Sequence, residues 1–218
     1  MFRVDLHVHT NYSFDCTSST SNIVKRIIEK NIDCIAITDH GTIEGALALR
    51  EMAPFQVIVG QEIKTLQGDL IGLFLSEKVP PGLHAIKAAE WVRRQNGIVM
   101  VPHPFDRIRG SALNSAAISD VLPVTDIIEG FNARNVFPGA DRMATQLAKS
   151  MNIPVAAVSD AHTVFELGST YTEIPKLSCD PKEFLEAIKE GSLIEKRSNP
   201  LVHWITTYNR LVKQFSRS

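Results

Sequence analysis

The sequence is poor in cysteine, with only Cys16, Cys34 and Cys179 among its 218 residues and no CxxC pair. An odd number of unpaired cysteines argues against a disulfide framework and a cysteine-based zinc site, and it is typical of a reducing compartment. Apolar runs of membrane-spanning length are absent, as is a basic segment followed by an apolar core near residue 1. The sequence therefore predicts a soluble cytoplasmic protein.

Net charge is also nearly absent, at −1, and no basic stripe with interleaved aromatic residues is visible. Such a chain has no general attraction to nucleic acid or to an anionic membrane, so any anion must be held by local groups. We therefore expect a small ligand rather than extended nucleic acid, with an oligonucleotide still possible. Hydrophobic residues make up 44% and charged residues 22%, which is ordinary for a globular domain.

Short apolar runs alternate with helical patterns along the chain, which predicts βαβ units and a parallel sheet. The predicted strands are residues 2–9, 33–38, 55–63, 69–75, 97–103, 126–131 and 154–160, with a weaker one at 170–174. The predicted helices between and after them are residues 20–31, 42–52, 83–97, 140–152 and 180–191. This number of strands favours an α/β barrel that is closed or nearly closed.

The chain shows no linker or repeat, so we expect one domain over residues 1–218. Residues 200–218 read as a last amphipathic helix that packs its Ile, Leu and Phe side chains on the barrel, with a partner-binding tail as the alternative. Residues 106–125 form the longest irregular segment, which makes them candidates for covering a pocket. The pattern leaves the oligomeric state open.

Two histidines, His7 and His9, lie two residues apart in the first predicted strand. Side chains at i and i+2 of a strand point to the same face, so the two imidazoles should project together, with Asp5 behind them and the apolar residues on the other face. Two polar side chains at a strand end would also give this pattern. Whether the pair binds a shared ion depends on further ligands from elsewhere in the chain.

Several more potential ligands follow the ends of predicted strands. They are Asp15, in the loop after the first strand, and Asp39, His40, Glu62, His103, Asp160 and His162. In a parallel α/β barrel these strand ends share one rim, where active sites form. Each residue taken singly could be a helix cap or a solvated strand end. Together, imidazoles and carboxylates suit Zn, Mn or Fe, and their number predicts a multinuclear hydrolytic site.

The segments DLHVHTNYSFD, ITDHGT, GQEI, PHPFDRIRG and SDAHTVFELG together resemble the successive motifs of the PHP (polymerase and histidinol phosphatase) superfamily. The resemblance spans residues 1 to about 175. It implies a distorted (β/α)7 TIM-like barrel that holds two to three divalent ions, usually Mn, Fe or Zn, and hydrolyses phosphate esters.

Carried over position by position, the resemblance implies a specific set of metal ligands. His7, His9, Glu62 and Asp160 would hold the first ion, Glu62 and His103 the second, and Asp15, His40 and His162 the third. Asp5 and Asp39 would orient ligand imidazoles. Some family members add a His or Cys to the second ion from the strand corresponding to residues 126–135. This sequence offers only Glu129 and Asn132 there.

The resulting hypothesis is a metal-dependent phosphatase in which a hydroxide bridging two ions attacks a small phosphate monoester. Glu62 and Asp160 would act through the ions, and His162 would be a proton donor if it is not a ligand. Arg134, Arg107 and Arg109 are candidates for gripping phosphate, with Lys64 as a further cation. The substrate would be nucleotide-like or histidinol phosphate-like.

Three alternatives remain open. They are a nuclease acting on oligonucleotide ends, a non-catalytic PHP module that keeps its metals for stability or partner binding, and a hydrolase of C–N bonds. The last class usually places a lysine on a middle strand, where this chain has Glu62.

Overall fold

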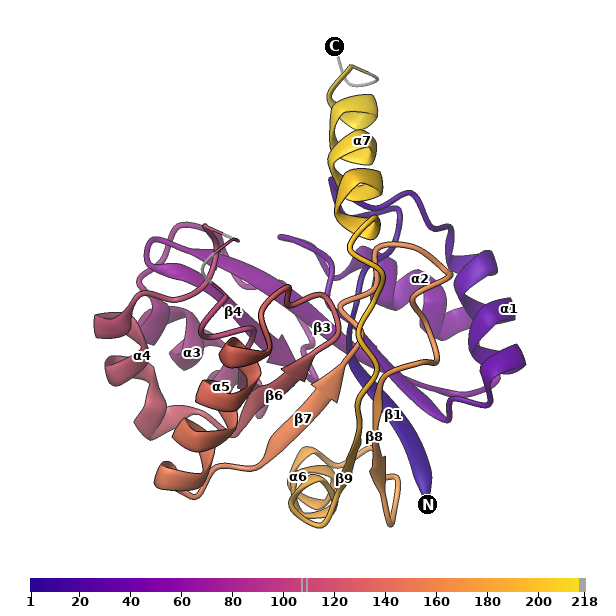
Figure 1. Cartoon of the computed structure of the whole chain (residues 1–218). Helices are drawn as coiled ribbons and strands as arrows, with labels where there is room; N and C mark the ends of the chain where they lie inside the picture. The colour runs from indigo at the N-terminus through magenta and orange to yellow at the C-terminus, as the bar shows by residue number, and fades with distance from the viewer. Residues whose placement is uncertain (107, 109, 216–218) are drawn as a thin grey trace.

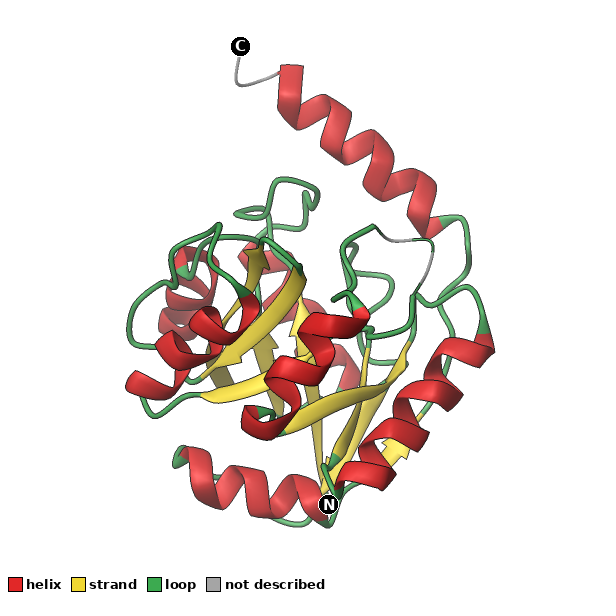
Figure 2. Cartoon of the chain, turned by 90° about the vertical axis from the view of Figure 1, so that its left-hand side faces the viewer, coloured by secondary structure: helices red, strands yellow, loops and turns green. Residues whose placement is uncertain are grey.

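The computed structural model describes residues 1–106, 108 and 110–215. Within this part of the chain, nine strands form a single mixed sheet that curls into a nearly closed barrel, and seven α-helices surround it (Figures 1 and 2). The predicted α/β barrel of PHP type is therefore confirmed.

The strands follow the predicted order along the chain, and one further short strand lies near the end. Their bounds are β1 Phe2–Val8, β2 Cys34–Ile37, β3 Gln56–Thr65, β4 Gly68–Leu73, β5 Ile98–Val101, β6 Ile127–Asn132, β7 Val155–Val158, β8 Tyr171–Ile174 and β9 Ser192–Ile194. In the sheet they lie in the order β7-β6-β5-β4-β3-β2-β1-β8-β9.

All of the described helices except α7 cover the outside of the barrel or one of its ends. Their bounds are α1 Thr20–Lys30, α2 Glu44–Met52, α3 Ala85–Arg94, α4 Ser115–Val121, α5 Pro138–Met151, α6 Pro181–Lys189 and α7 Val202–Phe215. Side-chain caps begin three of them: Ser19 for α1, Asn114 for α4 and Asp180 for α6 each accept a hydrogen bond from a backbone amide of the first turn.

The expectation of a parallel sheet is only partly correct. β4 runs antiparallel to both β3 and β5, and β8 runs antiparallel to both β1 and β9. Only residues 66 and 67 separate β3 from β4. A connection of that length allows a hairpin but not the crossover that a parallel pair needs.

The barrel nearly closes where β1 meets the end of β7. Val8 forms an isolated parallel bridge with Ala161, and the His9 amide donates to the Ala161 carbonyl at 3.0 Å. At the opposite end, α6 covers the barrel and buries Phe184 in its interior (Figure 1). The open end therefore lies where β1, β2, β3, β5 and β7 finish, and the loops leaving these strands surround it.

Two segments differ from the expectation drawn from the sequence. Residues 106–125 are not wholly irregular, because they contain α4 and a 3-10 turn at Leu122–Val124. α7 stands away from the barrel (Figures 1 and 2), and its Ile205 side chain is 43% exposed instead of packed on the barrel. That residues 1–218 form one domain stays a prediction.

Among the described helices, none is both long enough and apolar enough to cross a membrane.

Candidate metal centre

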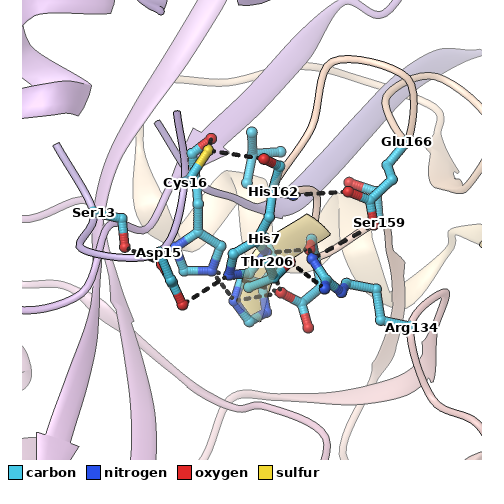
Figure 3. A network of polar contacts seen from close by, with 12 residues as sticks. His7, Ser13, Asp15, Cys16, Arg134, Ser159, His162, Glu166 and Thr206 are labelled. Carbon is cyan, nitrogen blue, oxygen red and sulfur yellow. Dashed lines mark hydrogen bonds and ion pairs between the residues drawn. The ribbon is translucent and has the colours of Figure 1, made fainter. Parts of the chain in front are cut away.

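The predicted ligands converge at the open end of the barrel, although they come from six separate parts of the chain. All of them except the half-buried His40 are buried: His7 of β1, His9 directly after this strand, Asp15 of the loop that follows, Glu62 of β3, His103 after β5, and Asp160 and His162 after β7. Burying this many ionisable groups together is costly unless they pair with one another or bind ions. Figure 3 shows the part of this network around His7, Asp15 and His162.

One group of potential ligands consists of His7, His9 and Glu62. The Nε2 atoms of the two histidines are 3.0 Å apart, and they lie 3.2 and 3.3 Å from Oε2 of Glu62. Bonds of about 2.1 Å from one ion to nitrogen or oxygen place neighbouring ligand atoms about 3.0 to 3.4 Å apart. The triangle of these three atoms therefore fits the edges of one coordination shell.

A second group consists of His9, Asp15, His40 and His162, and each offers one ligand atom within 4.8 Å of all the others. Oδ2 of Asp15 lies 3.3 Å from Nε2 of His40 and 3.2 Å from Nε2 of His162. The buried Nδ1 atom of His9 has no hydrogen-bond partner among the described residues. The donor set of imidazole and carboxylate suits Zn, Mn or Fe, and His9 belongs to both groups.

Asp160 and His103 lie beside the first group. Oδ1 of Asp160 is 3.6 Å from Nε2 of both His7 and His9, and Nε2 of His103 is 3.3 Å from Oε1 of Glu62. Asp160 therefore joins the group to which the resemblance assigned it. His103 and Glu62 stand as a pair, because no third potential ligand of the described residues completes a cluster around them.

Glu129 of β6 lies next to His103, but both of its carboxylate oxygens already contact other groups. Oε1 is 2.6 Å from Nδ1 of His7, and Oε2 accepts from the His103 amide and from the Asn132 side chain, both at 2.8 Å. A carboxylate against Nδ1 leaves Nε2 as the ligand atom of His7 and fixes its ring. Glu129 therefore orients a candidate ligand.

The structure does not give the expected orienting role to Asp5 and Asp39. Asp5 accepts from the backbone amides of His7 and Ser159, and Asp39 accepts from the amide and the hydroxyl of Thr10. Neither makes a hydrogen bond to an imidazole among these contacts. Both carboxylates therefore fix the backbone at the ends of the strands next to the candidate ligands.

Neighbouring carboxylates control the pKa values of the two histidines in the first group. Burial lowers the pKa of His7, but the neighbouring Asp160, Glu129 and Glu62 outweigh it and hold the pKa well above its usual value. Burial likewise lowers the pKa of His9, and hydrogen bonds to Asp160 and Glu62 raise it to about 9. The raised pKa values show that the carboxylates of this group attract positive charge, which is consistent with a metal-binding site.

His162 differs from the other histidines, because burial and the positive charges of His9 and Arg134 lower its pKa to about 3. Its ring is therefore neutral at physiological pH and offers a lone pair for an ion. Burial raises the pKa of Asp15, but His162 and His40 hold it far below its usual value. Nε2 of the His162 ring lies 3.2 Å from Oδ2 of Asp15, which is compatible with a ligand role for both residues.

A cavity of about 1070 Å³ opens beside these groups, and Asp15, His40, Glu62, His103, Asp160 and His162 form part of its wall. Arg134, which is 4% exposed, also lines this cavity, and so does the exposed Lys64. Both cations thus face the space next to the candidate ligands. The predicted phosphate contacts Arg107 and Arg109 lie outside the described residues.

Two contributors to the site were not singled out from the sequence. Glu166 accepts from the His162 amide at 3.1 Å and lies 3.5 Å from Nη1 of Arg134. Thr206 of α7 accepts from Nη2 of Arg134 at 2.7 Å. Glu166 belongs to the SDAHTVFELG motif, so its closeness in sequence to Asp160 and His162 could have identified it as part of the site. Thr206 carries no such signal, because only the fold brings α7 to the cavity.

Comparison with known sequences identifies relatives over nearly the whole chain. An uncharacterised protein of Methanocaldococcus jannaschii, MJ0417, is 33% identical over 220 residues, which cover 95% of this chain and 89% of that protein. A second uncharacterised protein of the same organism, MJ1587, is 36% identical over 146 residues, or 60% of this chain and 82% of that protein.

The solved structures that share this fold include two bacterial proteins. A two-domain protein of Bacteroides vulgatus, described as containing a predicted PHP-like metal-dependent phosphoesterase, superposes with a TM-score of 0.71 at 16% identity and covers 95% of this chain and 69% of that one. PsfC from Pseudomonas syringae superposes with a TM-score of 0.66 at 15% identity over 99% of both chains.

Family comparison adds two matches that agree with the site. Residues 138–193 match the PHP-associated family. Residues 5–122, more than half of the chain, match the PHP domain and contain the predicted ligands from His7 to His103. The chain therefore belongs to the PHP domain family.

Proposed function

We propose that this protein is a metal-dependent phosphoesterase that hydrolyses a small phosphate monoester. The observation that supports it most is the convergence of two ligand groups, joined by His9, on the wall of a cavity that also contains the guanidinium of Arg134. A pair of neighbouring cation sites next to an arginine fits a phosphoryl group, which carries negative charge on several oxygens. Membership of the PHP domain family agrees with this proposal.

Bound divalent ions would supply Lewis-acid activation of water and neutralise charge on the phosphoryl oxygens. The residues of this chain would do the rest. His7, His9, Glu62 and Asp160 would hold one ion, and Asp15, His40 and His162 would hold the other. Arg134, on the wall of the same cavity, would bind phosphoryl oxygens.

The size of the cavity supports a small substrate. Its volume of about 1070 Å³ lies near the upper end of the range for small-molecule sites, which is enough for a nucleotide-sized ester. Of its described cationic side chains, Arg134 is buried, and Lys64 and Arg210 are exposed. A long track of basic residues for a nucleic-acid backbone is not formed by the described cavity residues.

The proposal is tested by phosphate release from the Mn-loaded protein, with nucleotides, nucleoside bisphosphates and histidinol phosphate as substrates. Glu62→Gln should lower the rate by more than about 100-fold, because it weakens the hold on an ion that supplies several kcal/mol to the reaction. Glu195→Gln, at an exposed carboxylate, is the matched control and should keep the wild-type rate.

Metal content measured on the same samples makes a negative result informative. Wild-type protein that retains its ions but releases no phosphate from any monoester would contradict the proposal. Cleavage of short oligonucleotides by that sample would instead favour the nuclease alternative, and inactivity on both would favour a non-catalytic module.

A further inference from the structure

α7 turns part of its polar surface toward the cavity. His203, Thr206, Thr207 and Arg210 line the cavity wall together with one large apolar residue, Trp204, which is 76% exposed. Figures 1 and 2 show the helix standing at the open end of the barrel, clear of the sheet and of the other helices. An amphipathic helix that only stabilised the fold would bury its apolar side chains instead. The position of α7 therefore suits a role at the site.

The contact between α7 and Arg134 is specific. The hydroxyl of Thr206 donates to the Val202 carbonyl at 3.1 Å, so its lone pairs are free to accept from Nη2 of Arg134 at 2.7 Å. On the other side of the guanidinium, Nη1 lies 3.5 Å from Oε1 of Glu166 and also donates to the Asp160 carbonyl at 3.5 Å. In Figure 3, Thr206 and Glu166 lie near the Arg134 guanidinium.

These contacts leave part of the guanidinium available. Arginine has five N–H donors, and Nε of Arg134 makes no hydrogen bond to any described residue. A guanidinium binds two oxygens of a phosphoryl group only when they lie near its plane, opposite an edge that carries two N–H groups. With Nη1 and Nη2 held from two sides, Arg134 does not have to give up rotamer freedom when it binds an anion.

The far end of α7 is held by the loop that carries Asp15. Nζ of Lys213 donates to the carbonyls of Asn11 and Ser13, both at 2.6 Å. The Ser13 hydroxyl in turn donates to Asp15 at 2.9 Å. α7 thus spans the cavity from Arg134 to the loop that carries Asp15.

We propose that α7 is part of the phosphate-binding site, and that Thr206 is a positioning residue that orients the guanidinium of Arg134 toward the phosphoryl group. This inference rests on the proposed function for the identity of the anion. It predicts that the hydroxyl of Thr206 matters for phosphate affinity, although Thr206 itself touches neither phosphate nor ions.

The test is calorimetric titration of the Mn-loaded full-length protein with inorganic phosphate. Thr206→Val keeps the shape of the side chain but leaves Nη2 of Arg134 facing a methyl group. It should weaken phosphate binding roughly tenfold, the size expected for one hydrogen bond to a charged group. Thr206→Ser restores a hydroxyl and should bind within about twofold of the wild-type protein, which also controls for folding of α7.

A double-mutant cycle with Arg134→Met separates positioning from a general effect of the helix. In the Arg134→Met background, Thr206→Val should cause no further loss of affinity. An equal loss in both backgrounds, or wild-type affinity in Thr206→Val, would overturn the proposal, and so would a wild-type protein that binds no phosphate. Phosphate binding that obeys the cycle in a protein without phosphatase activity would support this inference while contradicting the proposed function.

Discussion

His103 and Asp160 adopt an uncommon backbone conformation at the site. Each follows shortly after a buried strand, and their φ angles are +30° and +53°. Residues other than glycine rarely adopt a positive φ, and this conformation costs about 1 to 3 kcal/mol when the surrounding structure enforces it. Here it turns both side chains from the strand ends toward Glu62 and the β1 histidines. Such strain is typical of residues that the fold places for function.

Glu129 acts at the same scale, and its contact with a ligand imidazole is the one between Oε1 and Nδ1 of His7. Glu129→Gln removes the charged acceptor that fixes the ring, so the protein should bind Mn about 10- to 100-fold more weakly, as for other groups that orient metal ligands. A chelator-competition titration measures this affinity. The exposed Glu195→Gln variant is the control for the loss of one charge. An unchanged affinity in Glu129→Gln would show that His7 does not need its partner.

At the scale of an element, α2 begins next to the site and depends on a glycine. Gly45 is the second residue of this helix, and a Cβ there would lie 2.0 Å from Oδ2 of Asp39 and 2.5 Å from Oγ1 of Thr10. The buried pair of Asp39 and Thr10 holds the loop after β1, which carries Asp15. The start of α2 and the end of β1 therefore pack without room for a side chain.

Gly45→Ala should destabilise the protein by about 1 to 3 kcal/mol, because overpacking outweighs the better helix propensity of alanine. Gly139, the second residue of α5, is the matched control, since a Cβ there meets nothing within 4 Å. Gly139→Ala should leave the free energy of unfolding unchanged or raise it by up to about 1 kcal/mol. Urea unfolding of both variants measures these values, and equal stabilities would refute the packing argument.

At the scale of the whole molecule, the site joins parts of the chain that are far apart. The second ligand group takes His9 from the residue after β1, Asp15 from the following loop, His40 from the segment after β2 and His162 from the segment after β7. An ion bound there connects the two strands at which the barrel nearly closes, β1 and β7. Binding to the folded state alone stabilises it by mass action.

Addition of Mn at about 100 times its dissociation constant should therefore raise the free energy of unfolding by about 2.7 kcal/mol, and EDTA should reverse the gain. His40→Gln removes one ligand and should reduce the gain. His84→Gln, at an exposed histidine away from the site, should keep it. The measurement is thermal unfolding of the wild-type protein and both variants, with and without Mn. If Mn stabilised all three proteins equally, the ion would bind elsewhere.

The barrel and most of the candidate ligands could be predicted from local patterns. Strand periodicity places His7 and His9 together, and alternation of strands with helices brings His40, Glu62, His103 and Asp160 to one rim. These features depend on residues close in sequence and on the general geometry of parallel barrels. The antiparallel strands β4 and β8 do not follow from the alternation. β3 and β4 extend beyond the predicted strands 55–63 and 69–75, and only this extension leaves the two-residue connection of a hairpin.

The sequence by itself thus determined the class of fold, the membership of a metal-binding family and the residues that gather at the rim. Only the tertiary structure decided which carboxylate holds His7, what orients Arg134 and which face α7 turns to the cavity. Glu129 is 122 residues from His7, and Thr206 is 72 residues from Arg134. Contacts over such distances follow from how the elements pack, and no local spacing of residue types encodes them.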